Sequence, residues 1–384
     1  MPKGAHHRMD TLEKGRNMKK VGILGGTGEI GKRVVKLLEN QYELFVSYHS
    51  AKPPVTAQNQ YIQLDVDISD DLEAFCSQCS IIVNCAGASF VNGEKIARVA
   101  AKYHIPVVDP SGESFLEDRI ADIRNESVYV LSSGFFPGMT GLLMKYLCES
   151  LKSVDCIMGL SITNEIPSRS AIKDFILTNT AGFGTALNYY ENGELKRDEI
   201  PIYRIVENKE YTLQNYYTIE LQRITQSYKP RRANWYYASF GEEITKLMQK
   251  AVIKYSLKQG DEALQQSVDS IIKLFEMTCG STAAYNYIHI EVTGSNNNQD
   301  HIRTADVHSS YSSDISSIIA AYTVKALAEK QPDFGIYYAM DIVDLEAVIH
   351  DLPQLNIDLA LTDKILEKEE HYEEGSIWDS STWE

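Results

Sequence analysis

A glycine-rich turn near the start of the chain constrains the fold more than any other feature of the sequence. It reads GGTGEIG from Gly25 to Gly31 and follows the apolar run 21–24, which predicts a buried β-strand. After the turn, apolar residues recur at helical spacing between residues 30 and 38, and lysine and arginine occupy the opposite face. Strand, glycine turn and helix in this order are the context that a dinucleotide-binding fingerprint requires.

The glycines of this fingerprint have separate physical roles. Gly26 allows a tight turn, Gly28 lets the backbone approach a pyrophosphate, and Gly31 lets the helix pack closely on the strand. The helix N-terminus offers unpaired N–H groups and the positive end of its dipole to phosphates. A glycine turn without a ligand is the alternative, which this context disfavours. The residues expected at the cofactor are Gly25, Gly26, Thr27, Gly28, Glu29, Ile30 and Gly31.

The end of the second predicted strand, 44–46, bears on the choice between NAD(H) and NADP(H). An NAD-preferring site usually places an acid there, about 20 residues after the glycines. No acid stands at this strand end, and the neutral or cationic side chains present could accept a 2′-phosphate without charge repulsion. NADP(H) is therefore favoured, although an arginine is missing. The residues concerned are Ser47, Tyr48, His49, Ser50 and Lys52.

A third predicted strand, 61–65, ends in Asp65, which is expected either to face the adenine or to cap the following turn. Further strands at 81–84, 106–109 and 128–131 alternate with helices, which predicts an α/β fold with a doubly wound parallel sheet. Small and polar residues follow these strands, where open sheets bind ligands. Those expected near the nicotinamide are Asn84, Ala86, Gly87, Pro110, Ser111, Gly112, Phe136, Pro137 and Gly138.

The pattern changes near residue 150 to alternating runs separated by polar turns. Asn192-Gly193 is a strong hairpin signal, and helices are expected at 242–257 and 261–277, so the second domain is predicted to be α+β. The expected organisation is a mobile extension at 1–17, a Rossmann domain at 18–150, a substrate and dimerisation domain at 151–314, a segment returning to the Rossmann domain at 315–352, and an acidic tail at 353–384.

Length and charge limit the class of protein. At 384 residues the chain exceeds a single typical core, and its net charge of −16 argues against nucleic-acid or anionic-membrane binding. No apolar run approaches the roughly 20 residues of a membrane helix, and the polar N-terminus lacks a signal-peptide core, so a cytoplasmic location is expected. Cys76 and Cys79 form a C-x-x-C without a second pair, which favours ordinary thiols and implies no metal.

Several stretches of the chain resemble one known family. Residues 22–38 resemble its first strand–turn–helix unit, and residues 82–113 resemble its segment that ends in an Asp-x-Ser-Gly-Glu turn. The run SSGFFPGMTGLLMKYL is similar to its Gly-Phe-x-Pro-Gly turn, and GIYYAMDIVDLEAVI is similar to its closing strand and helix. This is the saccharopine dehydrogenase-like family of NAD(P)-dependent oxidoreductases, which includes carboxynorspermidine dehydrogenase and homospermidine synthase. PSRSAIKDF and NGELKR resemble its second domain weakly.

The resemblance implies a Rossmann domain with an inserted α+β substrate domain, a homodimer, and reversible reduction of a C=N bond formed from an amine and a carbonyl compound. Arg169, Ser170 and Lys173 lie in the segment that the family turns toward the cleft, where a cation could hold a substrate carboxylate. The basic cluster of the second domain could bind carboxylates too, or could be solvated surface; it contains Arg223, Lys229, Arg231 and Arg232.

Catalytic roles are less constrained. Asp109 and Glu113 could orient a substrate amine, or could only fix the turn that contains them. A tyrosine or lysine could supply the proton that the imine nitrogen needs. The catalytic candidates are therefore Asp109, Glu113 and Lys173.

Three functions fit the sequence. The first is an NADP(H)-dependent reductase that acts on a C=N bond between amino-acid-like partners. The second keeps the cofactor and the fold but reduces a C=C or C=O bond. The third is a cofactor-binding sensor or scaffold without turnover, which would not need the turns that border the nicotinamide.

Overall fold

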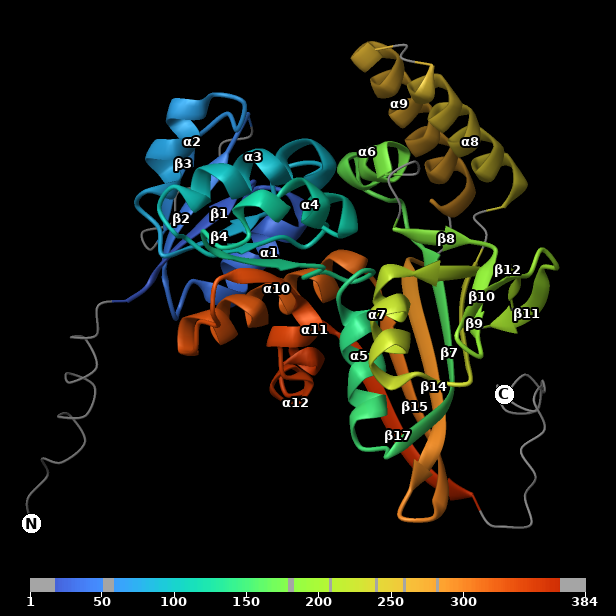
Figure 1. Cartoon of the computed structure of the whole chain (residues 1–384). Coiled ribbons are helices and arrows are strands. Elements are labelled where there is room, and N and C mark those ends of the chain that lie inside the picture. Colours follow the sequence, from blue (N-terminus) through green and yellow to red (C-terminus); the bar gives the residue numbers. More distant parts are fainter. Residues whose placement is uncertain are drawn as a thin grey trace, which may run out of the picture.

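The computed structural model describes residues 18–50, 59–178, 183–206, 209–238, 241–257, 260–280 and 283–366, which form two sheets and their covering helices (Figure 1). Lys52, the extension expected at 1–17 and residues 367–384 lie outside these described residues.

The first sheet has seven parallel strands in the order β16-β6-β5-β4-β1-β2-β3, which confirms the predicted α/β class. The order reverses at β1, so the C-terminal ends of β1 and β4 lie side by side, with Leu24 paired to Asn84. Such a reversal leaves a crevice where open α/β sheets bind ligands. The strands are β1 (Lys20–Leu24), β2 (Glu43–Tyr48), β3 (Gln60–Gln63), β4 (Ile81–Asn84), β5 (Val107–Val108), β6 (Val128–Leu131) and β16 (Gly335–Tyr338).

Helices cover both faces of this sheet because every central strand is apolar on both sides. One face is covered by α1 (Glu29–Leu38) and α10 (Ser312–Glu329), whose Val34 and Ala320 share a buried cluster with the sheet. The other face is covered by α2 (Ser69–Cys76), α3 (Ser89–Ala101) and α4 (Ser114–Arg119), and the short helix η1 (Ala121–Ile123) follows α4. The C-terminal segment thus returns to the first domain and adds β16 beside β6.

The second sheet is mixed and follows the order β10-β9-β13-β7-β14-β15-β17, with β12, β11 and β8 beside this path. Within it, β13 and β7 are parallel, while β7, β14, β15 and β17 run antiparallel to one another in turn. The strands are β7 (Ser153–Asn164), β8 (Gly184–Ala186), β9 (Asn188–Glu191), β10 (Glu194–Arg197), β11 (Ile202–Val206), β12 (Lys209–Thr218), β13 (Arg232–Ala238), β14 (Tyr285–Asn296), β15 (Gln299–Ser309) and β17 (Ile357–Leu366).

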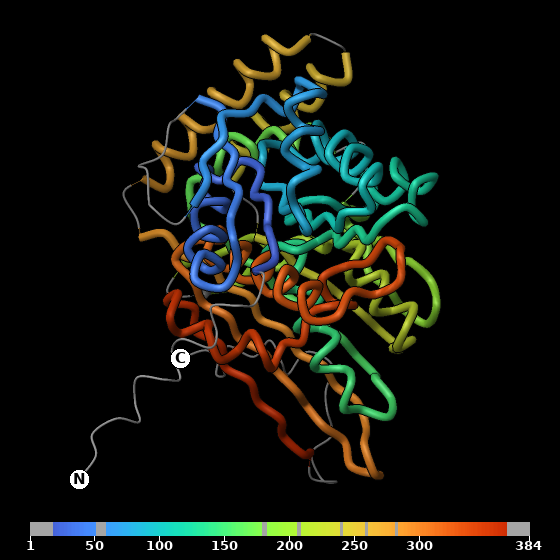
Figure 2. The backbone as a smooth tube through the Cα atoms, turned by 90° about the vertical axis from the view of Figure 1, so that its left-hand side faces the viewer, coloured from blue at the N-terminus to red at the C-terminus, as the bar shows by residue number. Residues whose placement is uncertain are grey.

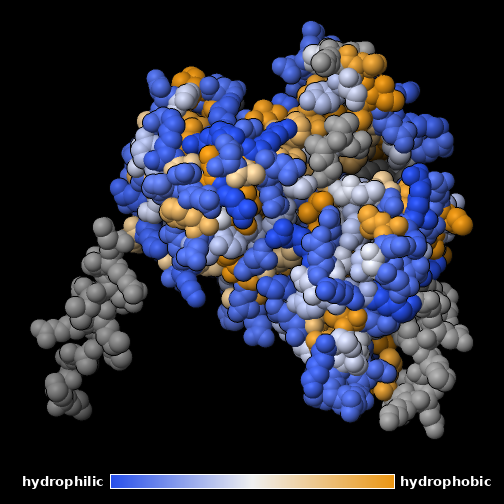
Figure 3. All heavy atoms as spheres, in the orientation of Figure 1, coloured by the Kyte–Doolittle hydropathy of each residue, from blue (hydrophilic) through white to orange (hydrophobic). Residues whose placement is uncertain are grey.

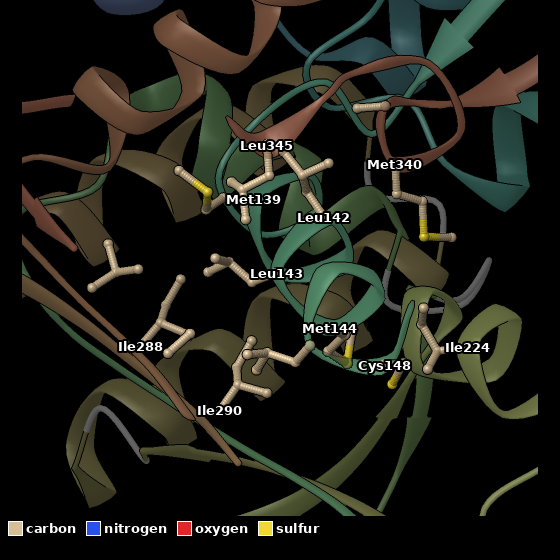
Figure 4. Close-up of a cluster of buried hydrophobic side chains, with 14 of the residues drawn as sticks. Met139, Leu142, Leu143, Met144, Cys148, Ile224, Ile288, Ile290, Met340 and Leu345 are labelled. Carbon is tan, nitrogen blue, oxygen red and sulfur yellow. The ribbon is translucent and has the colours of Figure 1, made fainter. Parts of the chain in front are cut away.

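Helices α5 (Met139–Glu149) and α7 (Ile219–Tyr228) cover one face of the second sheet. Figure 4 shows Leu143 of α5 turned toward Ile288 and Ile290 of β14. The short helices α11 (Ala339–Ile342), α12 (Leu345–Ile349) and η2 (Leu352–Leu355) join the same cluster. This core ties the segment that leaves the Rossmann sheet to the second domain.

Three further helices form a separate cluster at one end of the second domain: α6 (Arg169–Thr178), α8 (Glu242–Ser256) and α9 (Gly260–Cys279). Phe90 of α3 packs against this cluster, so α6 lies next to the first domain (Figure 1). The second domain therefore touches the Rossmann domain through α6 and α7 as well as through the packing of its sheet on α5.

The predicted hairpin at Asn192-Gly193 is confirmed between β9 and β10, and both turn residues have positive φ, 50° and 91°. The assignment of residues 353–384 to an acidic tail is wrong for 357–366, which form β17 alongside β15 (Figure 2). Ile357 is fully buried, and Leu359 and Leu361 pack on the main cluster of the second domain. Their alternation with polar residues is a strand signal that the surrounding acidic residues obscure.

Candidate functional site

The glycine turn lies at the C-terminal end of β1 and is held against β2 by hydrogen bonds. The N–H of Gly25, whose φ is +70°, donates to Ser47 Oγ over 3.0 Å, and the N–H of Gly26 donates to the Ser47 carbonyl over 2.8 Å. Gly28 begins α1 without any side-chain hydrogen bond at the cap. The first turn of α1 therefore presents its N–H groups toward the crevice, as an anion site requires.

The packing around the fingerprint glycines shows that they are needed for different reasons. A Cβ at Gly26 would stand 2.1 Å from Val46 Cγ1, and one at Gly31 would stand 2.3 Å from the Gly25 carbonyl, so protein contacts exclude both side chains. A Cβ at Gly28 would stand 3.3 Å from the Gly25 carbonyl oxygen, which is a tight but much smaller conflict, and Gly28 itself is exposed. Gly28 is thus the fingerprint glycine at which the backbone faces solvent, as the approach of a pyrophosphate would require.

The predicted ribose residues lie in the last two positions of β2 and directly after it, and they differ in their exposure. Ser47 is buried and its hydroxyl already accepts the Gly25 N–H, so it shapes the glycine turn. His49 and Ser50 are exposed and Tyr48 is half-buried. Asp65 lies nearby, with Oδ2 3.7 Å from His49 Nε2 and Oδ1 accepting the Asp67 N–H over 2.9 Å. A carboxylate thus stands beside this strand end, although none is adjacent in sequence.

At the ends of β4 and β5, one buried carboxylate organises two loops. Asp109 is 1% exposed, and its Oδ2 accepts Asn84 Nδ2 and Ser89 Oγ, each over 2.7 Å. Its Oδ1 accepts the N–H groups of Ser111 and Gly112 over 2.9 and 2.7 Å. Burial raises the pKa of Asp109, and these donors oppose that shift. Asp109 therefore fixes the loops that would border the nicotinamide.

Glu113, the next carboxylate along this loop, has a different environment. It is 1% exposed, and its Oε2 has no hydrogen-bond partner among the described residues. Burial, followed by the charge of Glu220, raises the pKa of Glu113 well above its usual range. Burial also raises the pKa of Tyr216 on β12, and the Glu113 charge adds to this. Burial thus favours the protonated form of the Glu113 carboxyl group, and one of its oxygens has no partner among the described residues.

The turn after β6 is held by the second domain. Glu220 Oε1, at the start of α7, accepts the N–H groups of Gly138 and Gly141 over 2.9 and 3.0 Å, and Oε2 accepts the Thr140 hydroxyl. Burial raises the pKa of Glu220 to about 7 against these donors. Phe136 precedes the cis Pro137 and stacks on Trp235 of β13, with ring centroids 5.5 Å apart. Phe136 is still 38% exposed, so part of its ring remains accessible to solvent.

The cations predicted to hold a substrate carboxylate are dispersed. Arg169 pairs with Asp269 of α9, and Arg231 pairs with Asp155 over 3.1 Å. Lys173 is half-buried, and Ser170 lies one turn before it on the same helix. The other two arginines also have partners: Arg223 lies 3.4 Å from Asp341 and 3.9 Å from the Tyr338 ring centroid, and Arg232 lies 2.9 Å from Asn234 and 3.8 Å from Glu191.

The basic cluster seen in the sequence therefore does not form one pocket. Arg232 lies at the start of β13, opposite Cys156 of β7. The other end of β13, where Tyr237 lies opposite Ser161, is therefore several residues away from Arg232. The side chains that do interact here are acidic and aromatic. Trp235 stacks on Phe136, and Glu113 interacts electrostatically with Glu220 and Tyr216. Glu220 and Tyr216 were not expected, because only the tertiary fold brings β12 and α7 to the Rossmann domain.

Comparisons with known proteins agree with this arrangement. Residues 20–135 match the family model of the semialdehyde dehydrogenase NAD-binding domain. Apo saccharopine dehydrogenase (L-Glu forming) from Saccharomyces cerevisiae has the same fold, with a TM-score of 0.60 and 12% identity over 91% of this chain and 100% of that chain. DAP dehydrogenase of C. glutamicum in complex with DAP gives a TM-score of 0.44 and 13% identity over 88% and 98% of the two chains. No curated protein matches the sequence.

The fold and the family model point to one class: the chain has a two-sheet fold like that of saccharopine dehydrogenase, and its Rossmann half matches the model of a dehydrogenase NAD-binding domain. In the part of the chain that the structure describes, no helix is long and apolar enough to cross a membrane. Within those same residues, no group of three or more His, Cys, Asp and Glu side chains is placed to hold a metal ion.

Proposed function

We propose that this chain is an NADP(H)-dependent oxidoreductase that reduces, or forms by oxidation, a C=N bond between an amine and a carbonyl partner of amino-acid-like substrates. The observation that carries the proposal is the exposed backbone of Gly28 at the N-terminus of α1, next to the reversal point of a parallel sheet. Similarity to the fold of a saccharopine dehydrogenase supports the same class of activity.

The proposed cofactor lies along the C-terminal ends of β2, β1 and β4. Its pyrophosphate would contact residues Gly26 to Ile30, and its nicotinamide would lie near Ala86, Gly87 and Ser111. His49 and Ser50 are exposed at the ribose position and would accept a 2′-phosphate. Asp65 is a carboxylate that would favour NADH instead, since its Oδ2 stands 3.7 Å from His49 Nε2.

The chemistry that such a cofactor supplies is hydride transfer between nicotinamide C4 and the carbon of a C=N bond. Reduction of the imine also requires a proton on nitrogen, so that the hydride and the proton together give the secondary amine. Glu113 is suited to donate it, because burial raises its pKa well above the usual range and its Oε2 has no hydrogen-bond partner among the described residues. Asp109 would act indirectly, by holding the loops on which Glu113 and Ser111 lie. Lys173 remains a second candidate on α6.

The second domain is also proposed to form a homodimer. Apolar side chains are exposed around β10 and β11, where Ile200, Tyr203 and Ile205 have exposed fractions of 79%, 57% and 67%. Figure 3 shows hydrophobic atoms on this edge of the second domain. Sedimentation velocity on the wild type and on an Ile205→Glu variant tests this: a dimer that the variant dissociates is expected, and a monomeric wild type would contradict it.

Calorimetric titration with NADPH and with NADH tests the cofactor assignment. Selective binding of NADPH is expected, preference for NADH would assign the ribose site to Asp65, and binding of neither would overturn the proposed function. Oxidation of NADPH is then followed with amine and oxo-acid pairs, supplied singly and together. Turnover only when both are present identifies C=N reduction. Turnover with a carbonyl alone, or binding without any turnover, would contradict that reaction.

A further inference from the structure

A buried carboxylate of the second domain contacts the Rossmann domain beside the proposed nicotinamide site. Asp174 on α6 is 7% exposed, and its Oδ2 and Oδ1 accept the N–H groups of Ser89 and Phe90 over 3.2 and 3.1 Å. These are the first two residues of α3, so a carboxylate from another domain caps this helix. The short chain segment before α3 therefore has its end fixed by the second domain.

Ser89 links Asp174 to the two loops that would border the nicotinamide. While its N–H donates to Asp174, its hydroxyl donates to Asp109 Oδ2 over 2.7 Å. The same Asp109 oxygen accepts Asn84 Nδ2, and the other accepts the N–H groups of Ser111 and Gly112. A single residue thus separates the second domain from the carboxylate that shapes both loops.

The loop between β4 and α3 is tied internally as well. The Ala86 N–H donates to Asn84 Oδ1 over 3.2 Å, and Asn92 Nδ2 of α3 donates to the Ala86 carbonyl over 2.8 Å. A displacement of the α3 N-terminus would therefore move Ala86 and would also disturb Asn84 and Asp109. Hydrogen bonds to a buried carboxylate contribute strongly because each unmade bond leaves a desolvated polar group.

We propose that Asp174 is a positioning residue, which couples the placement of the second domain to the shape of the two loops that would hold the nicotinamide. The proposal rests on the proposed function, since it assigns a role to those loops in cofactor binding. By linkage, a ligand that orders the loops also favours the docked position of α6. Burial raises the pKa of Asp174 to about 7, and the hydrogen bonds from the Phe90 and Ser89 N–H groups oppose this shift.

The test separates the nicotinamide half of the cofactor from the remainder. NADPH and 2′-phospho-ADP-ribose, which lacks nicotinamide, are titrated calorimetrically into the wild type and into Asp174→Asn. An asparagine keeps the size of the side chain but can accept only through Oδ1. We expect the affinity for NADPH to fall about tenfold, which corresponds to about 1.4 kcal/mol. The affinity for the fragment should change less than about twofold, because the fragment does not contact the two loops.

Asp344→Asn is the matched control, because Asp344 is also a helix-capping carboxylate, with its Oδ1 accepting the Glu346 N–H over 3.0 Å on α12. Its affinities should equal those of the wild type. If Asp174→Asn does not fold, Ser89→Ala removes the hydroxyl bond to Asp109 and should give the same split. For a chain that prefers NADH, NADH and ADP-ribose replace the two ligands.

The outcomes are distinguishable. If the wild type binds neither cofactor, the proposed function fails, and the positioning role fails with it. If the wild type binds NADPH but Asp174→Asn and Ser89→Ala bind it equally well, only the positioning role is overturned. Equal losses for NADPH and for the fragment would also overturn it, because a merely structural effect does not distinguish the two halves of the cofactor.

Discussion

The two ends of the proposed cofactor crevice are built in different ways. The end at β1 and β2 consists of backbone within the Rossmann domain, where the N–H groups of Gly25 and Gly26 donate to Ser47 and Gly28 is exposed. The end at β4 to β6 depends on buried carboxylates, two of which, Asp174 and Glu220, come from the second domain. A phosphate-binding turn can thus be local in sequence, whereas the reactive end is assembled by the tertiary fold.

The largest expected effect is on cofactor binding at the β1 and β2 end of the crevice. Gly28→Val places a branched side chain where the pyrophosphate would lie, and we expect at least about a 1,000-fold loss of NADPH affinity, or about 4 kcal/mol. The thermal midpoint should change little, because φ at Gly28 is −72° and the site is exposed. Calorimetry and thermal unfolding together measure this, and unchanged affinity would refute the phosphate assignment.

Gly26→Ala is the contrasting variant for that experiment. Its Cβ would stand 2.1 Å from Val46 Cγ1, so overpacking should lower the free energy of unfolding by about 1–3 kcal/mol. A stable Gly26→Ala protein would show that the turn is less tightly packed than the structure indicates.

At the β4 to β6 end of the crevice, substitution of Glu220 should have the largest effect on stability. Glu220→Ala leaves the N–H groups of Gly138 and Gly141 and the Thr140 hydroxyl without their acceptor, and should lower the free energy of unfolding by about 3 kcal/mol. Urea unfolding measures the change. Glu242→Ala is the control, because Glu242 also lies in the first turn of a helix but is exposed. Equal effects of the two substitutions would contradict the interdomain role of Glu220.

Protonation offers a graded test of the same end. Burial raises the pKa of Glu220 and of Asp174 to about 7, and those of Asp109, Glu113 and Glu165 also rise. Carboxyls with raised folded-state pKa values stabilise the fold fully below their unfolded pKa near 4, and this stability is lost as the pH rises through the folded pKa. The free energy of unfolding should therefore fall by about 2–3 kcal/mol from pH 5 to pH 8.

Urea unfolding across that pH range measures the slope, and Glu220→Gln should make it shallower by removing one of the titrating groups. A stability that increases from pH 5 to pH 8 would show that these carboxyls are ionised in the folded chain.

The smallest expected effect is a change in the preference between NADPH and NADH, at the position proposed for the ribose. His49→Asp adds a carboxylate beside Asp65 and should shift preference toward NADH by about tenfold, or about 1.4 kcal/mol. Asp65→Asn should act in the opposite direction by a few-fold, while its Oδ1 can still accept the Asp67 N–H. Competition between NADPH and NADH in calorimetry measures both variants, and no shift in either would place the ribose elsewhere.

Most of the first domain could be predicted because its signals are local. The run 21–24 is a buried strand, the glycines turn the chain, and Val34 and Leu38 recur on the buried face of α1. The hairpin at Asn192-Gly193 is equally local, since it depends on two residues that tolerate positive φ. Such features depend on a few neighbouring residues and on the hydrophobic periodicity of a single strand or helix.

The candidate site could be predicted only in part. Arg223, Arg231 and Arg232 are close in sequence, but a helix end and a strand start separate them, and each finds an acidic partner. Asp174 and Glu220 carried no catalytic signal, although Asp174 lies between Ile172 and Ile176, which are both buried. A carboxylate among core positions of a helix indicates a buried acceptor, but its donors cannot be read from the same segment.

The helix ends around the crevice have a consequence for small anions. Carboxylates of the second domain occupy the N-termini of three helices that the Rossmann half presents: Asp174 at α3, Glu220 at α5, and Glu165 at α10 through Ser312. Among the residues that the structure describes, no side chain accepts a hydrogen bond at the N-terminal cap of α1. Inorganic sulfate or phosphate should therefore collect at α1 and compete with the cofactor, so buffers that contain these ions would make the protein look like a weaker binder than it is.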